Sequence, residues 1–142
     1  MPETTVLNSG IDLLTGRFVP EVVYNTSVQT VHGSATAAGA VATFTLGAGQ
    51  RALILRVYVA NEGTGGASLA ELESNGVALI PYYLPSAGEI FDTGSFENPI
   101  AVIINTTSSS ITVGIYASSV ASGNTVEASL SYVILPDYRP SV

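Results

Sequence analysis

Apolar and polar residues alternate with a period of two along most of this chain, and turn residues interrupt the alternation at fairly regular intervals. This alternation is typical of β-strands, whereas an amphipathic helix needs apolar residues spaced three and four apart. We therefore predict strands in these segments: 22–30, 41–46, 51–61, 69–74, 77–84, 89–92, 100–105, 111–117 and 125–135. About nine short strands separated by turns predict an all-β chain, an antiparallel β-sandwich of the jelly-roll-like kind.

Two of these segments have well-defined faces. In segment 51–61, strict alternation points Leu53, Leu55, Val57 and Val59 one way, and Ala52, Ile54, Arg56, Tyr58 and Ala60 the other. One face is fully apolar, so we expect this strand in the middle of a sheet with that face in the core. In segment 125–135 one apolar stripe consists of Val126, Ala128, Leu130, Tyr132 and Ile134.

The turn residues predict how some strands connect. Asn75-Gly76 is a strong two-residue hairpin signal and should join segments 69–74 and 77–84 as an antiparallel pair. Pro81 lies in the second of these segments and cannot donate a ladder hydrogen bond, so that strand should be an edge strand or should bend at Pro81. The first strand should end at Gly33.

The two ends of the chain differ from the sandwich segment 22–135. Residues 1–21 contain apolar side chains without a sustained period, and residues 136–142 contain two prolines that favour extended backbone. We predict an N-terminal arm over 1–21 and a C-terminal tail over 136–142. An apolar arm needs a surface to cover, which is either that of another subunit or, for residues 11–20, the chain's own sandwich.

Composition and charge exclude several classes of function. The chain has no cysteine, so disulfides and cysteine-based metal or redox sites are excluded. It has four arginines, no lysine and a net charge of -7, which disfavours binding to nucleic acid. No apolar stretch approaches the length of about 20 residues that crosses a bilayer, and residues 1–10 do not resemble a signal peptide.

The low content of charged residues indicates a covered surface. Charged residues make up 11% of the chain, against about 25% in an ordinary soluble domain. Protein interfaces are depleted in Lys, Glu and Asp, so this composition favours a protein whose surface is partly covered by neighbours. The alternative is a monomer with a Ser- and Thr-rich exterior, from a secreted or thermophilic setting.

Candidate catalytic groups are few, and we predict that the chain is not an enzyme and needs no cofactor or metal. His32 is the only histidine and should be a turn residue near Gly33. A Gly-x-Ser-x-Gly nucleophile turn is absent, and residues 63–66 lack the helix and Gly-Lys-Ser/Thr sequence of a phosphate loop.

Carboxylates are the remaining candidates for chemistry. Glu71 and Glu73 share a strand face, and Glu89 and Asp92 could lie near them across the hairpin, as in a glycosidase or a Ca²⁺ site. A solvated or interface-facing strand is favoured, because the chain has no tryptophan and no Asp-rich calcium loop.

Two further motifs have a functional and a structural interpretation. Tyr82 and Tyr83 could form a sugar-stacking platform, but adjacent strand residues face opposite ways, so core or subunit packing is favoured. The glycosylation sequons at Asn25 and Asn105 should be ordinary strand and turn residues, since no secretion signal precedes them.

The central sequence resembles a pattern found in structural proteins of tailed-phage virions. Residues 45–61 (TLGAGQRALILRVYVAN) combine a polar strand, a Gly-Ala-Gly turn, a basic residue, an apolar strand and an asparagine. The later segments 75–79, 84–89 and 110–117 continue the resemblance, which covers residues 40–135. It is a similarity of style, because no single residue in it is diagnostic.

With the flanking arms, the chain most resembles capsid decoration proteins, also called cement proteins. This resemblance implies a compact β domain on the capsid exterior, commonly a homotrimer, that binds the major capsid protein through its arms. The implied partner-binding residues are Ile11, Leu13, Leu14, Arg17, Phe18, Tyr138 and Arg139. Two alternatives stay open: an accessory protein of the phage tail, baseplate or connector, and a carbohydrate-binding β-sandwich.

Overall fold

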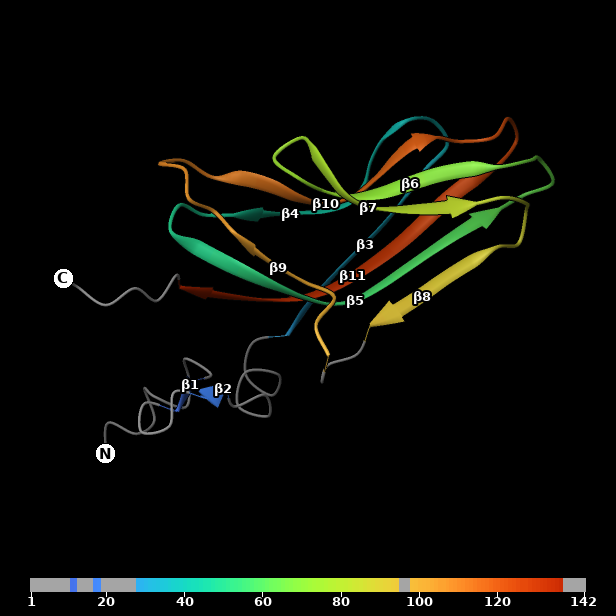
Figure 1. Ribbon diagram of the computed structural model, residues 1–142. Helices are drawn as coiled ribbons and strands as arrows, with labels where there is room; N and C mark the ends of the chain where they lie inside the picture. The colour runs from blue at the N-terminus through green and yellow to red at the C-terminus, as the bar shows by residue number, and fades with distance from the viewer. Residues whose placement is uncertain (1–10, 13–16, 19–27, 95–97, 137–142) are drawn as a thin grey trace.

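A computed structural model describes residues 11–12, 17–18, 28–94 and 98–136 of the chain (Figure 1). This part is all-β, and nine of its strands form two antiparallel sheets. The strands are β1 (Ile11–Asp12), β2 (Arg17–Phe18), β3 (Gln29–Ala35), β4 (Gly39–Leu46), β5 (Gln50–Glu62), β6 (Ser68–Ser74), β7 (Val77–Leu84), β8 (Ile90–Gly94), β9 (Ala101–Ile104), β10 (Ile111–Ser119) and β11 (Thr125–Pro136). A membrane-spanning helix is not found among these residues.

The two sheets lie face to face, as Figure 1 shows. One has the strand order β4-β10-β6-β7, and the other has the order β3-β11-β5-β8. Strand β9 also pairs with β5: β8 lies against residues 56–60 of β5, and β9 lies against residues 51–54. The prediction of an antiparallel sandwich with β5 in mid-sheet is confirmed.

The core lies between the sheets and draws on both. Its largest fully buried side chains are Leu46, Ile54, Leu72, Leu84, Ile115, Leu130, Val57, Val59, Val113 and Val126. The predicted stripe of β11 is confirmed, because Val126, Ala128, Leu130 and Tyr132 are buried there and Ile134 packs against them. Burial of such side chains stabilises the fold by about 1.5–3 kcal/mol each.

A β-bulge in β5 corrects the predicted faces of segment 51–61. Ser131 of β11 pairs with Arg56 and the next residue, Tyr132, pairs with Ile54, so Leu55 is an extra residue without an opposite partner. Such a bulge shifts the alternation by one residue. Ile54 and Val57 therefore both face the core, while Leu53 and Leu55 pack with Val133 and Leu135 in a second apolar cluster.

Strand β3 does not end at Gly33, and His32 is not a turn residue. His32 lies in the middle of β3, opposite Ser129 of β11, and the strand continues to Ala35. The glycine is needed for close packing, because a Cβ atom at Gly33 would lie 1.9 Å from the carbonyl oxygen of Val41. Residues 22–27 of the predicted first strand lie outside the described residues.

The predicted hairpin is confirmed. β6 and β7 pair around Asn75 and Gly76, whose φ angles of 52° and 79° are those of a two-residue turn of the Asn-Gly type. Strand β7 lies at the edge of its sheet, as Pro81 predicts.

Local pairing occurs within the predicted N-terminal arm. Ile11 pairs with Phe18 and Asp12 with Arg17, which forms a short antiparallel ladder between β1 and β2. The sequence gives no signal for this ladder, because strands of two residues are too short to show an alternation of apolar and polar side chains.

Candidate functional surfaces

Exposed large apolar side chains gather along one side of the sandwich, which we call the apolar flank. Its members are Val77, Leu79 and Tyr83 of β7, Ile90 and Phe91 of β8, and Val102 and Ile104 of β9. Their exposed fractions run from 40% at Phe91 to 61% at Val77. Strand β7 ends one sheet, and β8 and β9 lie along the end of the other.

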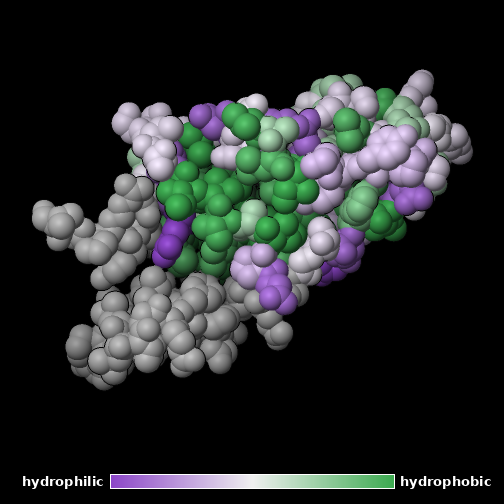
Figure 2. Space-filling model, in the orientation of Figure 1, coloured by the Kyte–Doolittle hydropathy of each residue, from purple (hydrophilic) through white to green (hydrophobic). Residues whose placement is uncertain are grey.

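The strands of the apolar flank lie close together in space. The rings of Tyr82 on β7 and Phe91 on β8 are in tilted contact, with centroids 5.6 Å apart. Figure 2 shows hydrophobic side chains gathered over the region between β7 and β9. This ring contact closes the sandwich between β7 and β8, the outer strands of the two sheets.

The opposite side of the sandwich is different. It is formed by β3 and β4, which follow each other in the chain and end the two sheets. Among the described residues, none of the exposed large apolar side chains lies on β3 or β4. The asymmetry between the two sides marks the apolar flank as a surface suited to contact with protein.

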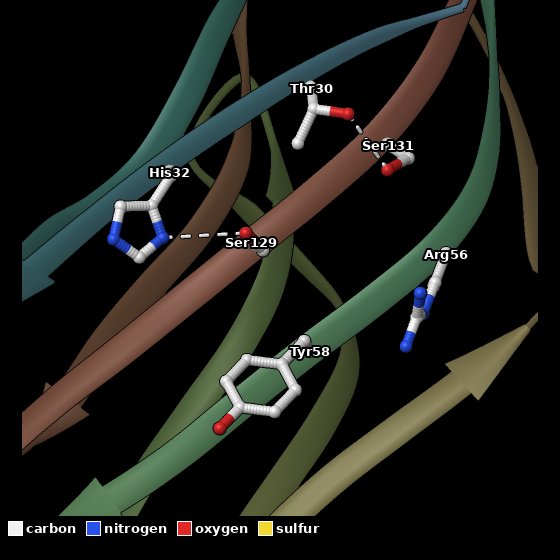
Figure 3. Close-up of a pocket in the computed structure, with 6 residues that line it drawn as sticks. All are labelled: Thr30, His32, Arg56, Tyr58, Ser129 and Ser131. Carbon is white, nitrogen blue, oxygen red and sulfur yellow. Dashed lines mark hydrogen bonds between the residues drawn. The ribbon is translucent and has the colours of Figure 1, made fainter.

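A second surface feature is a shallow polar groove on the outer face of the β3-β11-β5 sheet. Thr30, His32, Arg56, Tyr58, Ser129 and Ser131 line it, and its volume is about 420 Å³ (Figure 3). The small side chains of Ser129 and Ser131 form the floor on β11. Thr30 and His32 on β3 and Arg56 and Tyr58 on β5 flank this floor, because they lie opposite the two serines on the neighbouring strands.

Hydrogen bonds fix the β3 side of the polar groove. The hydroxyl oxygens of Thr30 and Ser131 lie 3.1 Å apart, and Nδ1 of His32 lies 3.3 Å from the hydroxyl oxygen of Ser129. Figure 3 shows both pairs bridging β3 and β11.

An ion pair fixes the β5 side. Arg56 donates from Nε and Nη2 to the two carboxylate oxygens of Asp92 on β8, at 2.8 and 2.6 Å. These hydrogen bonds raise the pKa of Arg56 and lower the pKa of Asp92. Both side chains are about half exposed, so the pair adds little to stability and mainly orients the guanidinium.

The acidic residues weighed as a possible site are not all brought together, because Glu71 and Asp92 lie on different sheets. Glu71 lies on the outer face of the β4-β10-β6-β7 sheet, where it accepts a hydrogen bond from Ser118, whereas Asp92 pairs with Arg56 on the outer face of the other sheet. Burial and the charge of Glu71 raise the pKa of Glu73. Within the described ranges, no group of three or more His, Cys, Asp or Glu could hold a metal ion.

The Gly-rich loop has a structural role. Buried Asn61 donates from Nδ2 to the carbonyl oxygens of Gly66 and Ser86, at 3.0 and 3.1 Å, and its Oδ1 accepts from Ser68 and Asn124. This network ties three loops together at one end of the sandwich. Gly63 is close to the same network, since a Cβ atom there would lie 2.4 Å from Oδ1 of Asn124.

The sequon at Asn105 is also structural. Asn105 is buried, and its Nδ2 donates to the carbonyl oxygens of Leu46 and Ser109 at 3.0 and 2.8 Å. A glycan could not be attached there without breaking at least one of these bonds. Asn25 lies outside the described residues.

The two adjacent tyrosines face opposite ways, as predicted. Tyr82 is buried in the core and Tyr83 is 57% exposed on the apolar flank. A shared sugar platform is therefore excluded.

Three of the predicted arm residues belong to the described part of the chain. The backbones of Ile11, Arg17 and Phe18 belong to the β1–β2 ladder. The predicted residues Leu13, Leu14, Tyr138 and Arg139 lie outside the described residues.

Sequence reasoning missed both surfaces. Segment 51–61 did signal Arg56 and Tyr58 as polar members of an outer face, but the partners of these residues come from β3, β8 and β11. The order in which β3, β11, β5 and β8 pair cannot be predicted from the sequence of any one of these segments.

No family model matches the sequence, and no curated protein matches it. Among solved structures, the chain is similar to one from the capsid asymmetric unit of cyanophage Pam1, with 20% identity, a TM-score of 0.34, and coverage of 77% of this chain and 85% of that one. It is also similar to a family two carbohydrate esterase from Cellvibrio japonicus, with 12% identity, a TM-score of 0.30, and coverage of 81% of this chain and 36% of that one. Both are weak likenesses between β-rich folds.

Proposed function

We propose that this chain is a structural protein of a tailed-phage virion, and specifically a capsid decoration protein on the outside of the head. In this proposal the sandwich is the body of the protein. Contacts across the apolar flank join copies into an oligomer, with a trimer favoured, and the terminal arms bind the major capsid protein.

The observation that carries the proposal is the apolar flank. Seven large apolar side chains on the outer strands β7, β8 and β9 are at least 40% exposed. These side chains are 40–61% exposed, so full burial would contribute about half of the usual ~1.5–3 kcal/mol for each of them, and an assembly that covers the flank gains free energy from the sum. A lone domain would gain nothing from this arrangement and would risk aggregation through its strand edges.

The composition supports the same assignment. Few residues are charged and the net charge is -7, which suits a protein that is partly covered and that docks on a basic patch of a shell protein. Among the described residues, Ser129 and His32 form a hydroxyl–imidazole pair at 3.3 Å on the exposed faces of adjacent strands, and a carboxylate is not hydrogen-bonded to this imidazole. We therefore propose a binding and assembly role without catalysis.

The arms would act by multivalency. An arm attached to a bound oligomer has a high effective concentration at the shell, so several weak contacts produce tight binding. The proposed contacts are Ile11, Leu13, Leu14, Arg17 and Phe18 at one end and Tyr138 and Arg139 at the other.

The test is binding to phage heads that lack this protein. Full-length protein and a version trimmed to residues 22–135 would be mixed with heads, and the bound protein would be counted by native mass spectrometry and cryo-electron microscopy. The proposal expects the full-length protein to bind in a fixed stoichiometry and the trimmed one to bind at least about tenfold more weakly. Failure of both to bind heads in any expansion state would overturn it, and binding to isolated tails instead would favour a tail accessory.

A further inference from the structure

We infer that the polar groove on β3, β11 and β5 is a binding site for an uncharged, hydroxyl-rich ligand, that is, a saccharide. This site is separate from the apolar flank, which holds the exposed apolar side chains of β7, β8 and β9. The inference therefore stands independently of the decoration role.

The register of the sheet builds the groove from two rows of residues. One row runs His32, Ser129, Tyr58 and Asp92 across β3, β11, β5 and β8, and the next runs Thr30, Ser131, Arg56 and Gly94. The bulge at Leu55 places Arg56 and Tyr58 on this outer face, while Val57 and Val59 remain in the core. The groove is thus a consequence of the β5 bulge and of small residues on β11.

The lining has the chemistry that a sugar needs. Figure 3 shows the ring of Tyr58 beside β5 among the residues that line the groove, and Tyr58 is partly exposed, so its ring offers an apolar surface for the C–H face of a sugar ring. Three hydroxyl side chains, of Thr30, Ser129 and Ser131, can each donate and accept hydrogen bonds. Arg56 uses two N–H groups on Asp92, so three of its five donors are not used in that pair.

The charge of the groove selects against an anion. The guanidinium of Arg56 is already neutralised by the carboxylate of Asp92, 2.6 Å away. The whole chain carries a net charge of -7, which repels phosphates and other anions at long range. Donors and acceptors without net charge match the hydroxyl groups of a neutral sugar.

The size of the groove sets the expected affinity. A volume of about 420 Å³ lies within the range of about 300–1,000 Å³ usual for ligand sites, and it accommodates one or two sugar rings. The groove is open to solvent, with Thr30 and His32 exposed, so much of the ligand stays hydrated. We expect weak binding, with Kd of about 1 mM, which corresponds to about -4 kcal/mol.

The experiment is a two-dimensional NMR titration of the full-length protein, labelled with nitrogen-15. The probes are the methyl glycosides of glucose, galactose, mannose and N-acetylglucosamine, each added to about 50 mM, and inorganic phosphate as an anion probe. Two variants test the groove: Tyr58→Ala removes the ring face, and Ser129→Val fills the floor with a residue that suits a strand. Tyr83→Ala is the matched control, because Tyr83 is an exposed tyrosine on the apolar flank.

The inference expects at least one glycoside to shift the amide signals of residues 30, 32, 58, 129 and 131. Tyr58→Ala and Ser129→Val should each weaken this binding at least about tenfold, whereas Tyr83→Ala should leave it unchanged. Three results would overturn the inference: no glycoside shifts these signals, phosphate alone shifts them, or the shifts persist in both groove variants. Since head binding is not measured, failure here would leave the decoration proposal standing.

Discussion

The aromatic ring of Tyr132 stacks on that of Phe44, with centroids 3.7 Å apart and planes inclined by 7°. Tyr132 belongs to β11 and Phe44 to β4, so this pair joins the two sheets of the sandwich. The hydroxyl of Tyr132 also donates to Oε1 of Gln29 on β3 at 3.1 Å. One residue thus links three strands on the side of the sandwich opposite the apolar flank.

Truncation of this tyrosine should destabilise the fold strongly. Tyr132→Ala removes the stacked ring and leaves a cavity, which should lower the free energy of unfolding by about 3–5 kcal/mol. Tyr132→Phe keeps the stack and loses one hydrogen bond, so its cost should be about 1 kcal/mol. Urea unfolding followed by circular dichroism measures both. Equal costs for the two variants would show that the hydrogen bond, and not the stack, joins the sheets.

The Asn61 network predicts a large effect from a single polar residue. Asn61→Ala removes the hydrogen bonds to the carbonyl oxygens of Gly66 and Ser86 and takes away the acceptor of the buried Ser68 hydroxyl, so the free energy of unfolding should fall by about 1–3 kcal/mol. Asn75→Gly is the matched control, because Asn75 lies in a turn with positive φ that glycine adopts readily. Thermal unfolding compares the two, and an equal loss in the control would refute a special role for Asn61.

Packing at Gly33 gives a test of the β3–β4 contact. Gly33→Ala places a Cβ atom 1.9 Å from the carbonyl oxygen of Val41, so the backbones must separate and stability should fall by at least about 1 kcal/mol. Gly66→Ala is the control, since a Cβ atom at Gly66 meets nothing within 4 Å. The melting temperatures of both variants measure the difference. A neutral Gly33→Ala would mean that β3 and β4 can move apart freely.

Buried tyrosines predict a loss of stability at high pH. Burial raises the pKa of Tyr82 and of Tyr132 above the usual value of 10.0. Above about pH 10 the unfolded chain therefore releases these protons before the folded protein does, and stability falls as pH rises. The hydroxyl of Tyr82 is buried and lacks a hydrogen-bond partner in the described part of the chain. Tyr82→Phe should thus be at least as stable as the wild type at pH 8 and should lose less stability at pH 11. The measurement is the melting temperature of both proteins at pH 8 and pH 11. An equally large decrease in the melting temperature of the variant and of the wild type between these pH values would contradict the prediction.

The sequence predicted the type of most elements and one of their pairings. The alternation in 125–135 and the Asn75-Gly76 turn were sufficient for this, because they depend on neighbours in the chain. The faces of segment 51–61 were wrong on the N-terminal side of the bulge, at Leu53 and Leu55, and right at Val57 and Val59. An extra residue at Leu55 is set by the pairing of β5 with β11, which lies far away in sequence.

The candidate surfaces were less predictable than the fold. Val77, Phe91 and Val102 look like core residues in the sequence, and only the strand order shows that their strands lie at sheet edges. The polar groove consists of residues that pair across β3, β11 and β5, so a local sequence motif does not predict it. Conversely, Glu71 and Glu73 stay close together on β6 as the sequence predicts, whereas Asp92 lies on the other sheet and pairs with Arg56.

The central claim is that protein covers the apolar flank, and the oligomeric state tests it most directly. Sedimentation equilibrium would compare the full-length wild type with a Val102→Thr/Ile104→Thr variant. Both residues are about half exposed on β9, and threonine preserves the β-branched shape and strand propensity of valine. We predict a discrete oligomer, with a trimer favoured, for the wild type at about 10 µM and dissociation at least about tenfold easier for the variant, with unchanged circular dichroism. A wild type that remains monomeric, or a variant that associates equally well, would contradict the account.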